Sequence, residues 1–258
     1  MCGRYASSRR PEDLVEEFEI DKVEVKEPLP PDFNVAPTKQ VYAVVERAPR
    51  GDGSDDVPGA PRERQLRSVR WGLVPFWAKN PSIGNKLINA RMETVHEKPA
   101  FRRAFTSRRC LLPADGYFEW YPTEQRTSAG KPVKQPFFIR PADGGLLAMA
   151  GLYEIWRDPT RDEDDPQRFL WTCTVLTTTA EDSVGHIHDR MPLLVERDRR
   201  TAWLDPTNAA VDDLLDLLVP AAPGLLEAYP VSTSVNNVRN NGPELLEAVE
   251  PVEGGRPT

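Results

Sequence analysis

The feature that most limits how this chain folds is a series of short β-branched and aromatic segments with helical stretches placed irregularly among them. The segments that read as strands are Gln40–Glu46, Arg67–Leu73, Cys110–Pro113, Gly116–Tyr121, Pro136–Arg140, Leu146–Trp156 and Arg168–Thr179. The 26 prolines predict many turns and few long helices. Because strands and helices do not alternate regularly, we predict an α+β fold with a largely antiparallel sheet.

Helices and loops are predicted between these strands. Predicted helical segments cover residues 10–18, 89–94, 99–109 and 209–218, with a helical turn at 180–185. Polar, Gly- and Pro-rich residues predict a mobile hairpin tip at 50–65 and a loop at 122–135. Tyr229, Val231 and Thr233 predict a last strand, and Pro230 confines that strand to a sheet edge.

The length of 258 residues fits one large domain, and no internal repeat or linker divides the sequence. We therefore predict a single domain over residues 1–250. Residues 251–258 are polar and rich in Gly and Pro, so we predict a flexible C-terminal tail there.

The cysteines and the charge balance limit the classes of protein to consider. Three cysteines cannot all pair, and no secretory segment follows Met1, so we expect a reducing, cytoplasmic setting. No apolar run approaches the roughly 18 residues that span a bilayer, so no membrane partner is expected. The net charge of −7 argues against non-specific attraction to nucleic acid but permits a local basic groove.

Cys2 offers unusual chemistry if Met1 is removed, which a small second residue favours. Its α-amine and thiol would then lie on adjacent carbons, with reference pKa values of about 7.7–8.0 and about 8.5. An aldehyde can form an imine with such an amine, and the thiol can close a thiazolidine ring. The alternative interpretation is an ordinary second residue that happens to be cysteine.

Asn89, Glu119 and His188 are the candidate partners of Cys2. Strand alternation places Glu119 opposite Phe118 and Trp120, facing either a cleft or solvent. A desolvated cleft would raise the pKa of Glu119 and make it suitable for proton transfer near neutral pH. His188 is also a candidate for proton transfer, because a histidine ring titrates near neutral pH. Asn89 suits either a helix N-cap or a hydrogen bond to the Cys2 amine.

Metal binding is a weaker interpretation of the histidines. His186 and His188 would share one strand face, a possible half-site for zinc, but no further ligands are evident. Cys110 and Cys173 lie in apolar, strand-like segments and read as buried structural residues. We therefore expect no metal and no cofactor.

Aromatic and arginine residues gather in the sequence around these candidates. They include Arg4, Trp71, Phe76, Trp77, Arg91 and Arg190. Aromatic platforms beside arginine suit single-stranded nucleic acid, where stacking contributes about 1–3 kcal/mol per base. We expect Trp77 itself to be a core residue, as most buried tryptophans are.

A set of sequence blocks in a fixed order resembles the SOS-response-associated peptidase (SRAP) family. The blocks are Met1–Tyr5, Phe33–Thr38, Trp71–Pro75, Asn89–Thr94, Arg109–Pro113, Gly116–Trp120 and His188–Pro192, with a weaker match at Val231–Asn237. The resemblance implies a single-domain α+β fold with a barrel-like core of mostly antiparallel strands and flanking short helices.

The resemblance also implies a function and roles for individual residues. It implies a sensor of abasic sites in single-stranded DNA that cross-links through mature Cys2 as a thiazolidine after autocatalytic removal of Met1. Asn89 would hold the Cys2 amine, Glu119 would act as acid and base, and His188 would assist proton transfer. The positions that would grip DNA are Arg4, Asn34, Trp71, Arg91 and Arg190. A monomer associated with the nucleoid or replication fork, with replication proteins as partners, is expected.

Two alternatives from other classes stay open. A chain starting with Cys-Gly after Met1 also resembles class II glutamine amidotransferases, in which the cysteine attacks an amide. The third interpretation is a single-stranded DNA-binding protein that forms no covalent bond.

Overall fold

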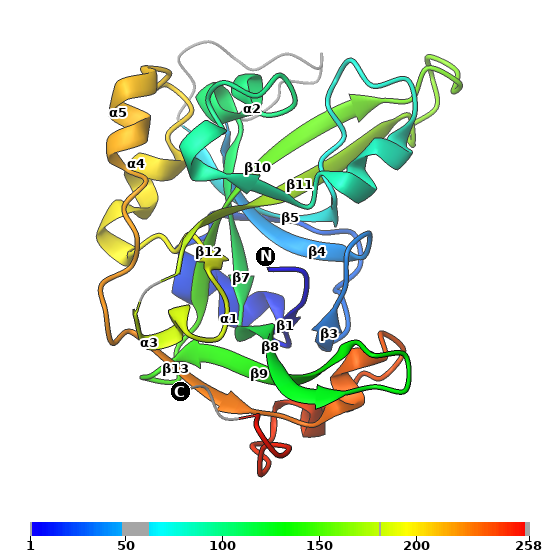
Figure 1. Cartoon of the computed structure of the whole chain (residues 1–258). Helices are drawn as coiled ribbons and strands as arrows, with labels where there is room; N and C mark the ends of the chain where they lie inside the picture. Colours follow the sequence, from blue (N-terminus) through cyan, green and yellow to red (C-terminus); the bar gives the residue numbers. More distant parts are fainter. Residues whose placement is uncertain (1, 48–61, 181, 256–258) are drawn as a thin grey trace.

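The core of the molecule is a closed five-stranded barrel. The computed structural model describes residues 2–47, 62–180 and 182–255. The barrel strands are β4 (Gln40–Arg47), β5 (Glu63–Trp71), β7 (Arg109–Ala114), β10 (Leu147–Arg157) and β11 (Phe169–Thr179). Hydrogen bonds connect them in the order β11–β10–β7–β4–β5, and a parallel pairing of β5 with β11 closes the ring (Figure 1).

Three short strands extend this sheet outside the ring. They are β2 (Lys22–Glu24), parallel to β5, β6 (Asn89–Arg91), parallel to β11, and β12 (Arg190–Pro192), antiparallel to β11. The main barrel pairings are antiparallel, which confirms the predicted α+β class with a barrel-like core.

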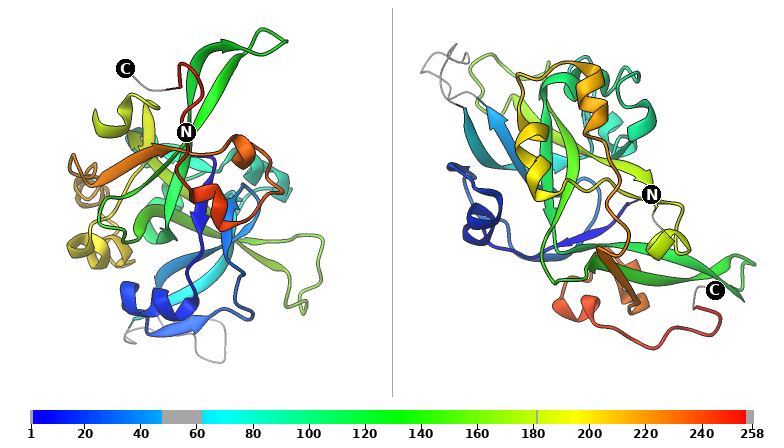
Figure 2. Two further views of the ribbon diagram at one scale, coloured as in Figure 1. Left: turned by 90° about the horizontal axis from the view of Figure 1, so that it is seen from below. Right: turned by 90° about the vertical axis from the view of Figure 1, so that its left-hand side faces the viewer.

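A second sheet covers one end of the barrel. Its order is β13–β9–β8–β1–β3, with β13 at Leu226–Pro230, β9 at Pro132–Pro141, β8 at Gly116–Arg126, β1 at Tyr5–Ser7 and β3 at Asp32–Val35. Tyr5, Tyr117 and Ile139 of this sheet join the same buried cluster as the barrel interior. The outer half of the β8–β9 hairpin projects away from the body of the molecule (Figure 2).

Strand alternation divides the barrel side chains between two buried clusters. Val41, Ala43 and Val45 of β4 point into the barrel, whereas Tyr42 and Val44 point outward. The outer cluster is covered by α1 (Pro11–Phe18), α2 (Arg102–Ser107), α4 (Arg200–Leu204) and α5 (Val211–Asp216). None of the helices in the described part of the chain has the length and apolar character that spanning a bilayer requires.

The remaining short helices connect these layers. They are α3 (Asp182–Gly185) and the 3₁₀ helices η1 (Pro81–Lys86), η2 (Met92–Thr94), η3 (Arg197–Arg199), η4 (Thr233–Asn236) and η5 (Pro243–Leu246). Gly72 follows β5 with a φ of 117°, and a Cβ there would lie 2.6 Å from the carbonyl oxygen of Gly84. Glycine is therefore required where this turn meets η1.

Most predicted elements are present, two predictions are wrong and one helix was missed. Residues 89–94 form β6 and a 3₁₀ turn instead of a helix, because Asn89–Arg91 pairs with Val175–Thr177. The predicted loop at 122–135 is largely strand, since β8 and β9 pair as far as Arg126 and Pro132. Helix α4 was not predicted, and the helix predicted at 209–218 is the shorter α5.

Other predictions have a simpler outcome. Strand β13 lies at the sheet edge, as Pro230 required, but it ends at Pro230, and Thr233 begins η4 instead of continuing the strand. Strand β5 begins at Glu63, earlier than expected, and most of the predicted hairpin tip at 50–65 lies outside the described residues. In the predicted tail, the backbone N–H of Val252 donates to Gln135 Oε1 over 2.9 Å. The domain boundary at residue 250 stays a prediction.

Candidate active site

The pairing of β1 with β8 brings the start of the chain to Glu119. Tyr5 pairs with Tyr117, and the backbone N–H of Phe118 donates to the carbonyl of Arg4 over 2.9 Å. When this antiparallel pairing is extended from Tyr5 toward the start of the chain, Cys2 lies opposite the part of β8 that follows Phe118. Cys2 is fully buried there, with its Sγ 4.0 Å from the carbonyl oxygen of Arg4.

Asn89 holds the backbone of Cys2 from the barrel side. Its Nδ2 donates to the carbonyl oxygen of Cys2 over 2.8 Å, and the pairing of β6 with β11 fixes its position. Its Oδ1 is buried and has no hydrogen-bond partner among the described residues. The contact differs from the expected one, since the amide binds the Cys2 carbonyl and its oxygen remains as an acceptor.

Glu119 faces the interior and not solvent. Only 3% of its surface is exposed, and burial raises the pKa of its carboxyl group, with the nearby His188 opposing the shift. A carboxylate in this setting binds a proton at higher pH than an exposed one, which suits it to acid–base chemistry closer to neutral pH.

His188 lies at the solvent side of Glu119. Its Nε2 is 3.9 Å from Glu119 Oε2, and its Nδ1 accepts the backbone N–H of Arg190 over 3.0 Å. The Nδ1 also lies 3.0 Å from Oδ1 of the largely exposed Asp189. When Nδ1 accepts the bond from Arg190, the ring proton is on Nε2, on the side of Glu119.

The thiol of Cys2 is kept neutral by its surroundings. Burial is the main cause that raises its pKa well above the ordinary value, and the charge of Glu119 adds to the shift. The thiol therefore needs a nearby base to react as thiolate. Glu119 lies close enough for its charge to act on the thiol, which makes it the candidate base.

A groove connects this cluster with solvent. It has a volume of about 750 Å³, and Glu119, Trp120, Lys134, His188 and Asn236 are among its lining residues. The groove combines a cation and an aromatic ring with two ionisable groups at its floor. Glu119 and His188 are thus reachable by a substrate that enters the groove.

Arg4 and Asn34 form a buried network beside the groove. Arg4 Nη1 donates to Asn34 Oδ1 over 2.7 Å and to the carbonyl of Val235 over 2.9 Å. Asn34 is fully buried and donates to backbone carbonyls of residues 235–240. The guanidinium of Arg4 also lies 5.8 Å from the ring of Trp120. Asn34 thus positions Arg4 and the C-terminal loop, and its side chain faces the protein.

Trp71 and Trp77 have places opposite to those that the sequence suggested. Trp71 is fully buried, with its Nε1 donating to the carbonyl of Ile88 and its ring 5.1 Å from that of Tyr5. Trp77 is 49% exposed and Phe76 is 50% exposed, with Arg103 over the Phe76 ring. The exposed aromatic rings of this segment are therefore those of Phe76 and Trp77.

The other two predicted DNA contacts differ from each other. Arg91 is exposed at the end of β6. Arg190 forms a bidentate ion pair with Glu93, and its hydrogen bonds lower the pKa of the Glu93 carboxyl group. Arg190 also donates a hydrogen bond to the carbonyl oxygen of Thr177. Within residues 2–47, 62–180 and 182–255, no group of three or more metal-ligating side chains occurs.

Two residues of the site were not predicted. Tyr117 is fully buried, and its hydroxyl has no hydrogen-bond partner within the described chain. Burial is the main cause of the raised pKa of the Tyr117 hydroxyl, and the charges of Cys2 and Glu119 add to the shift. Trp120 lines the groove and donates its Nε1 to Asn236 Oδ1 over 2.6 Å. The period of two along Gly116–Trp120 places Tyr117 on the face of Glu119, a signal that was available in the sequence.

Comparison with known proteins gives a consistent result. A family model described as SOS response associated peptidase (SRAP) matches residues 1–238. The abasic site processing protein YoaM of Bacillus subtilis is 40% identical over 96% of this chain and 98% of its own. The abasic site processing protein YedK of Escherichia coli is 32% identical over 96% of this chain and all of its own.

Relatives extend to vertebrates and to solved structures. The abasic site processing protein HMCES of Xenopus tropicalis is 34% identical over 72% of this chain and 58% of its own. A crystal structure of a Bacteroides thetaiotaomicron protein has a TM-score of 0.75 and 23% identity, covering 96% of this chain and 100% of that one. That structural likeness shows a shared fold.

Proposed function

Because this chain belongs to the SOS response associated peptidase (SRAP) family, we propose that it processes abasic sites in single-stranded DNA by a covalent cross-link through Cys2. Relatives across the whole chain are named abasic site processing proteins. The observation that carries the proposal is the cluster of Cys2, Asn89, Glu119 and His188, of which Glu119 and His188 line an open groove.

The proposed reaction begins with hydrolysis of the Met1–Cys2 bond, which the protein performs on itself. The free amine of Cys2 then attacks the aldehyde carbon of the ring-opened sugar, and loss of one water gives an imine. The thiol adds across this C=N bond: sulfur bonds to carbon and the nitrogen gains a proton. The product is a thiazolidine, and the whole condensation releases one water.

The three partners of Cys2 have distinct roles in this scheme. Glu119 takes the thiol proton and supplies a proton to the departing hydroxyl, which its raised pKa favours. His188 exchanges protons with Glu119 and the sugar at the solvent side. Asn89 positions Cys2 through its carbonyl and offers Oδ1 to the amine.

The DNA strand is proposed to follow the groove and the exposed aromatic surface. Arg4 and Arg91 would contact the strand, Trp77 would stack on a base, and Trp120 would border the lesion. Asn34, Trp71 and Arg190 would act indirectly by holding these elements. We further propose a monomeric protein that acts in the cytoplasm on damaged, replicating DNA, with no membrane partner.

The test is incubation with an abasic single-stranded oligonucleotide followed by a denaturing gel. The wild type should give an SDS-resistant adduct, and Cys2→Ala should give none while its affinity for intact single-stranded DNA stays within about twofold. Cys173→Ala is the matched control, since it removes another buried thiol and should keep the adduct. An adduct with Cys2→Ala would refute the proposal.

The same protein samples distinguish the alternatives. A glutamine amidotransferase would release ammonia from glutamine, and a purely non-covalent DNA-binding protein would never give the adduct. Intact mass of purified protein should show loss of Met1 in the wild type and its retention in any fraction that fails to cross-link.

A further inference from the structure

The hydroxyl of Tyr117 is a buried polar group that the reaction proposed above leaves unused. The side chain is fully buried, and its oxygen has no hydrogen-bond partner within the described chain. Other buried aromatic side chains are paired, since the ring N–H groups of Trp71, Trp156 and Trp203 each donate to a backbone carbonyl oxygen. A buried donor without an acceptor destabilises the folded state, and a catalytic role is one physical reason for such a group.

Strand geometry places this hydroxyl at the Cys2 site. Tyr117 and Glu119 are two residues apart on β8, so their side chains leave the strand on the same face. Tyr5 pairs with Tyr117 on the neighbouring strand, and the Tyr117 ring belongs to the same buried cluster as Cys2. After burial, the charges of Cys2 and Glu119 contribute to the raised pKa of the hydroxyl, so it lies within electrostatic range of both groups.

The hydroxyl can donate a hydrogen bond in this site but cannot act as a base. Its raised pKa keeps the proton on the oxygen throughout the neutral pH range. The neutral thiol of resting Cys2 is a weak acceptor, which agrees with the unpaired hydroxyl in the resting structure. A thiolate is a charged acceptor, and hydrogen bonds to charged groups are stronger than those between neutral groups. Loss of the thiol proton would thus give Tyr117 the acceptor that it lacks.

We propose that Tyr117 is a further catalytic residue, whose hydroxyl donates a hydrogen bond to the sulfur of Cys2 while the thiazolidine ring closes. In this step Glu119 takes the thiol proton, the sulfur bonds to the imine carbon and the imine nitrogen gains a proton. Tyr117 transfers no proton, and it stabilises the negative charge on sulfur before the C–S bond forms. The inference rests on the cross-link proposed above. It applies to ring closure, which uses the sulfur, and not to imine formation, which uses only the amine.

Tyr117→Phe removes the hydroxyl and keeps the ring in the core. Borohydride separates the two chemical steps, because it reduces an imine to a stable amine and leaves a thiazolidine intact. With borohydride present from the start of a single-turnover reaction on abasic single-stranded DNA, the variant should form trapped adduct at the wild-type rate. Without borohydride, its SDS-resistant adduct should form about tenfold more slowly or less, because a hydrogen bond to a charged group is lost.

A control variant and a stability measurement exclude a general effect on the fold. Tyr153→Phe removes the hydroxyl of another buried tyrosine of the barrel, whose pKa is shifted by burial and by the charges of groups other than Cys2 and Glu119. Both adducts of this control should form at the wild-type rate. The melting temperature of Tyr117→Phe should equal or exceed that of the wild type, because the change deletes an unpaired buried donor.

The outcomes distinguish this inference from the function on which it rests. If the wild type gives no adduct with or without borohydride, the proposed cross-link itself is wrong. If the wild type cross-links and Tyr117→Phe closes the ring at the same rate, the cross-link stands and the role of Tyr117 is wrong. Equal slowing of the trapped and the untrapped adduct, or a lowered melting temperature, would assign the hydroxyl a structural role and overturn the inference as well.

Discussion

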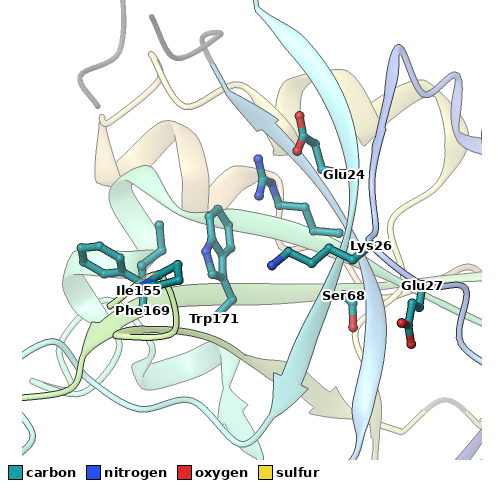
Figure 3. A pocket seen from close by; sticks show the side chains of 9 residues that line it. Glu24, Lys26, Glu27, Ser68, Ile155, Phe169 and Trp171 are labelled. Carbon is teal, nitrogen blue, oxygen red and sulfur yellow. The ribbon is translucent and has the colours of Figure 1, made fainter. Parts of the chain in front are cut away.

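The two ends of the barrel carry reactive and charged groups in opposite physical settings. At the end covered by the second sheet, Cys2 and Glu119 are buried, and burial raises the pKa of both. An open cavity lies over Trp171 at the opposite end, where Lys26 and Arg67 share its walls with two carboxylates (Figure 3). Burial tunes proton affinity at the first end, whereas cations and carboxylates balance one another at this open mouth.

This contrast indicates which chemistry each end suits. A buried thiol and a buried carboxylate that act on each other's charge can exchange protons during a reaction, because burial raises the pKa of both groups. Lysine and arginine at the open mouth keep their charge and exchange no proton near neutral pH. We therefore propose that bond formation takes place at the covered end.

The largest effect that separates the two ends is expected from Glu119→Gln. It should slow adduct formation about 100-fold, the lower range of what positioned acid–base groups contribute. In the wild type the rate should fall as pH drops through the raised pKa of Glu119, and the variant should lack this limb. Single-turnover rates on quenched gels measure both.

A matched variant sharpens this result. Glu227→Gln removes a half-buried carboxylate paired with Arg140, far from Cys2 in the fold, and should leave the rate unchanged. If Glu119→Gln forms the adduct at the wild-type rate across the neutral pH range, the proposed acid–base role of Glu119 is wrong.

A smaller effect is expected from the exposed tryptophan on the DNA-binding surface. Trp77→Ala should weaken binding of intact, 5′-hydroxyl single-stranded DNA about tenfold, since one stacked base contributes about 1–3 kcal/mol. Arg67→Gln, at the open mouth, should leave this affinity within twofold. Fluorescence anisotropy with a labelled oligonucleotide gives both values, and equal losses for the two variants would mean that the strand contacts both ends.

The smallest effect concerns stability. The raised pKa of Glu119 means that the folded protein keeps a proton that the unfolded chain releases above about pH 4.3. The contribution of this group is therefore fully present below that pH, and the free energy of unfolding falls as pH rises through the folded-state pKa. Glu119→Gln cannot ionise, so its melting temperature relative to wild type should be higher at pH 8 than at pH 5. An unchanged difference would show that Glu119 is not desolvated.

Much of the fold was predictable from local pattern. Alternation and β-branched residues located the barrel strands, and Pro11 with its following acids located α1. The outer half of the β8–β9 hairpin was missed because it projects into solvent and lacks a buried face to impose alternation. Strand β6 was missed because its pairing with β11 is a contact over more than eighty residues of sequence.

The site was predictable in its members and less so in its geometry. Cys2, Asn89, Glu119 and His188 are indeed brought together, but the hydrogen bond of Asn89 to the Cys2 carbonyl is a backbone detail that no sequence pattern encodes. Trp71 and Trp77 lie six residues apart in one aromatic block, but Trp71 ends β5 and is buried, whereas Trp77 follows the turn at Gly72 and is half exposed.

Peptide mass mapping of the purified adduct tests the central claim most directly. After nuclease and protease digestion, tandem mass spectrometry should find the sugar remnant on a peptide that begins at Cys2, bound through both nitrogen and sulfur. A remnant on a lysine, or on a peptide that still begins with Met1, would contradict the account.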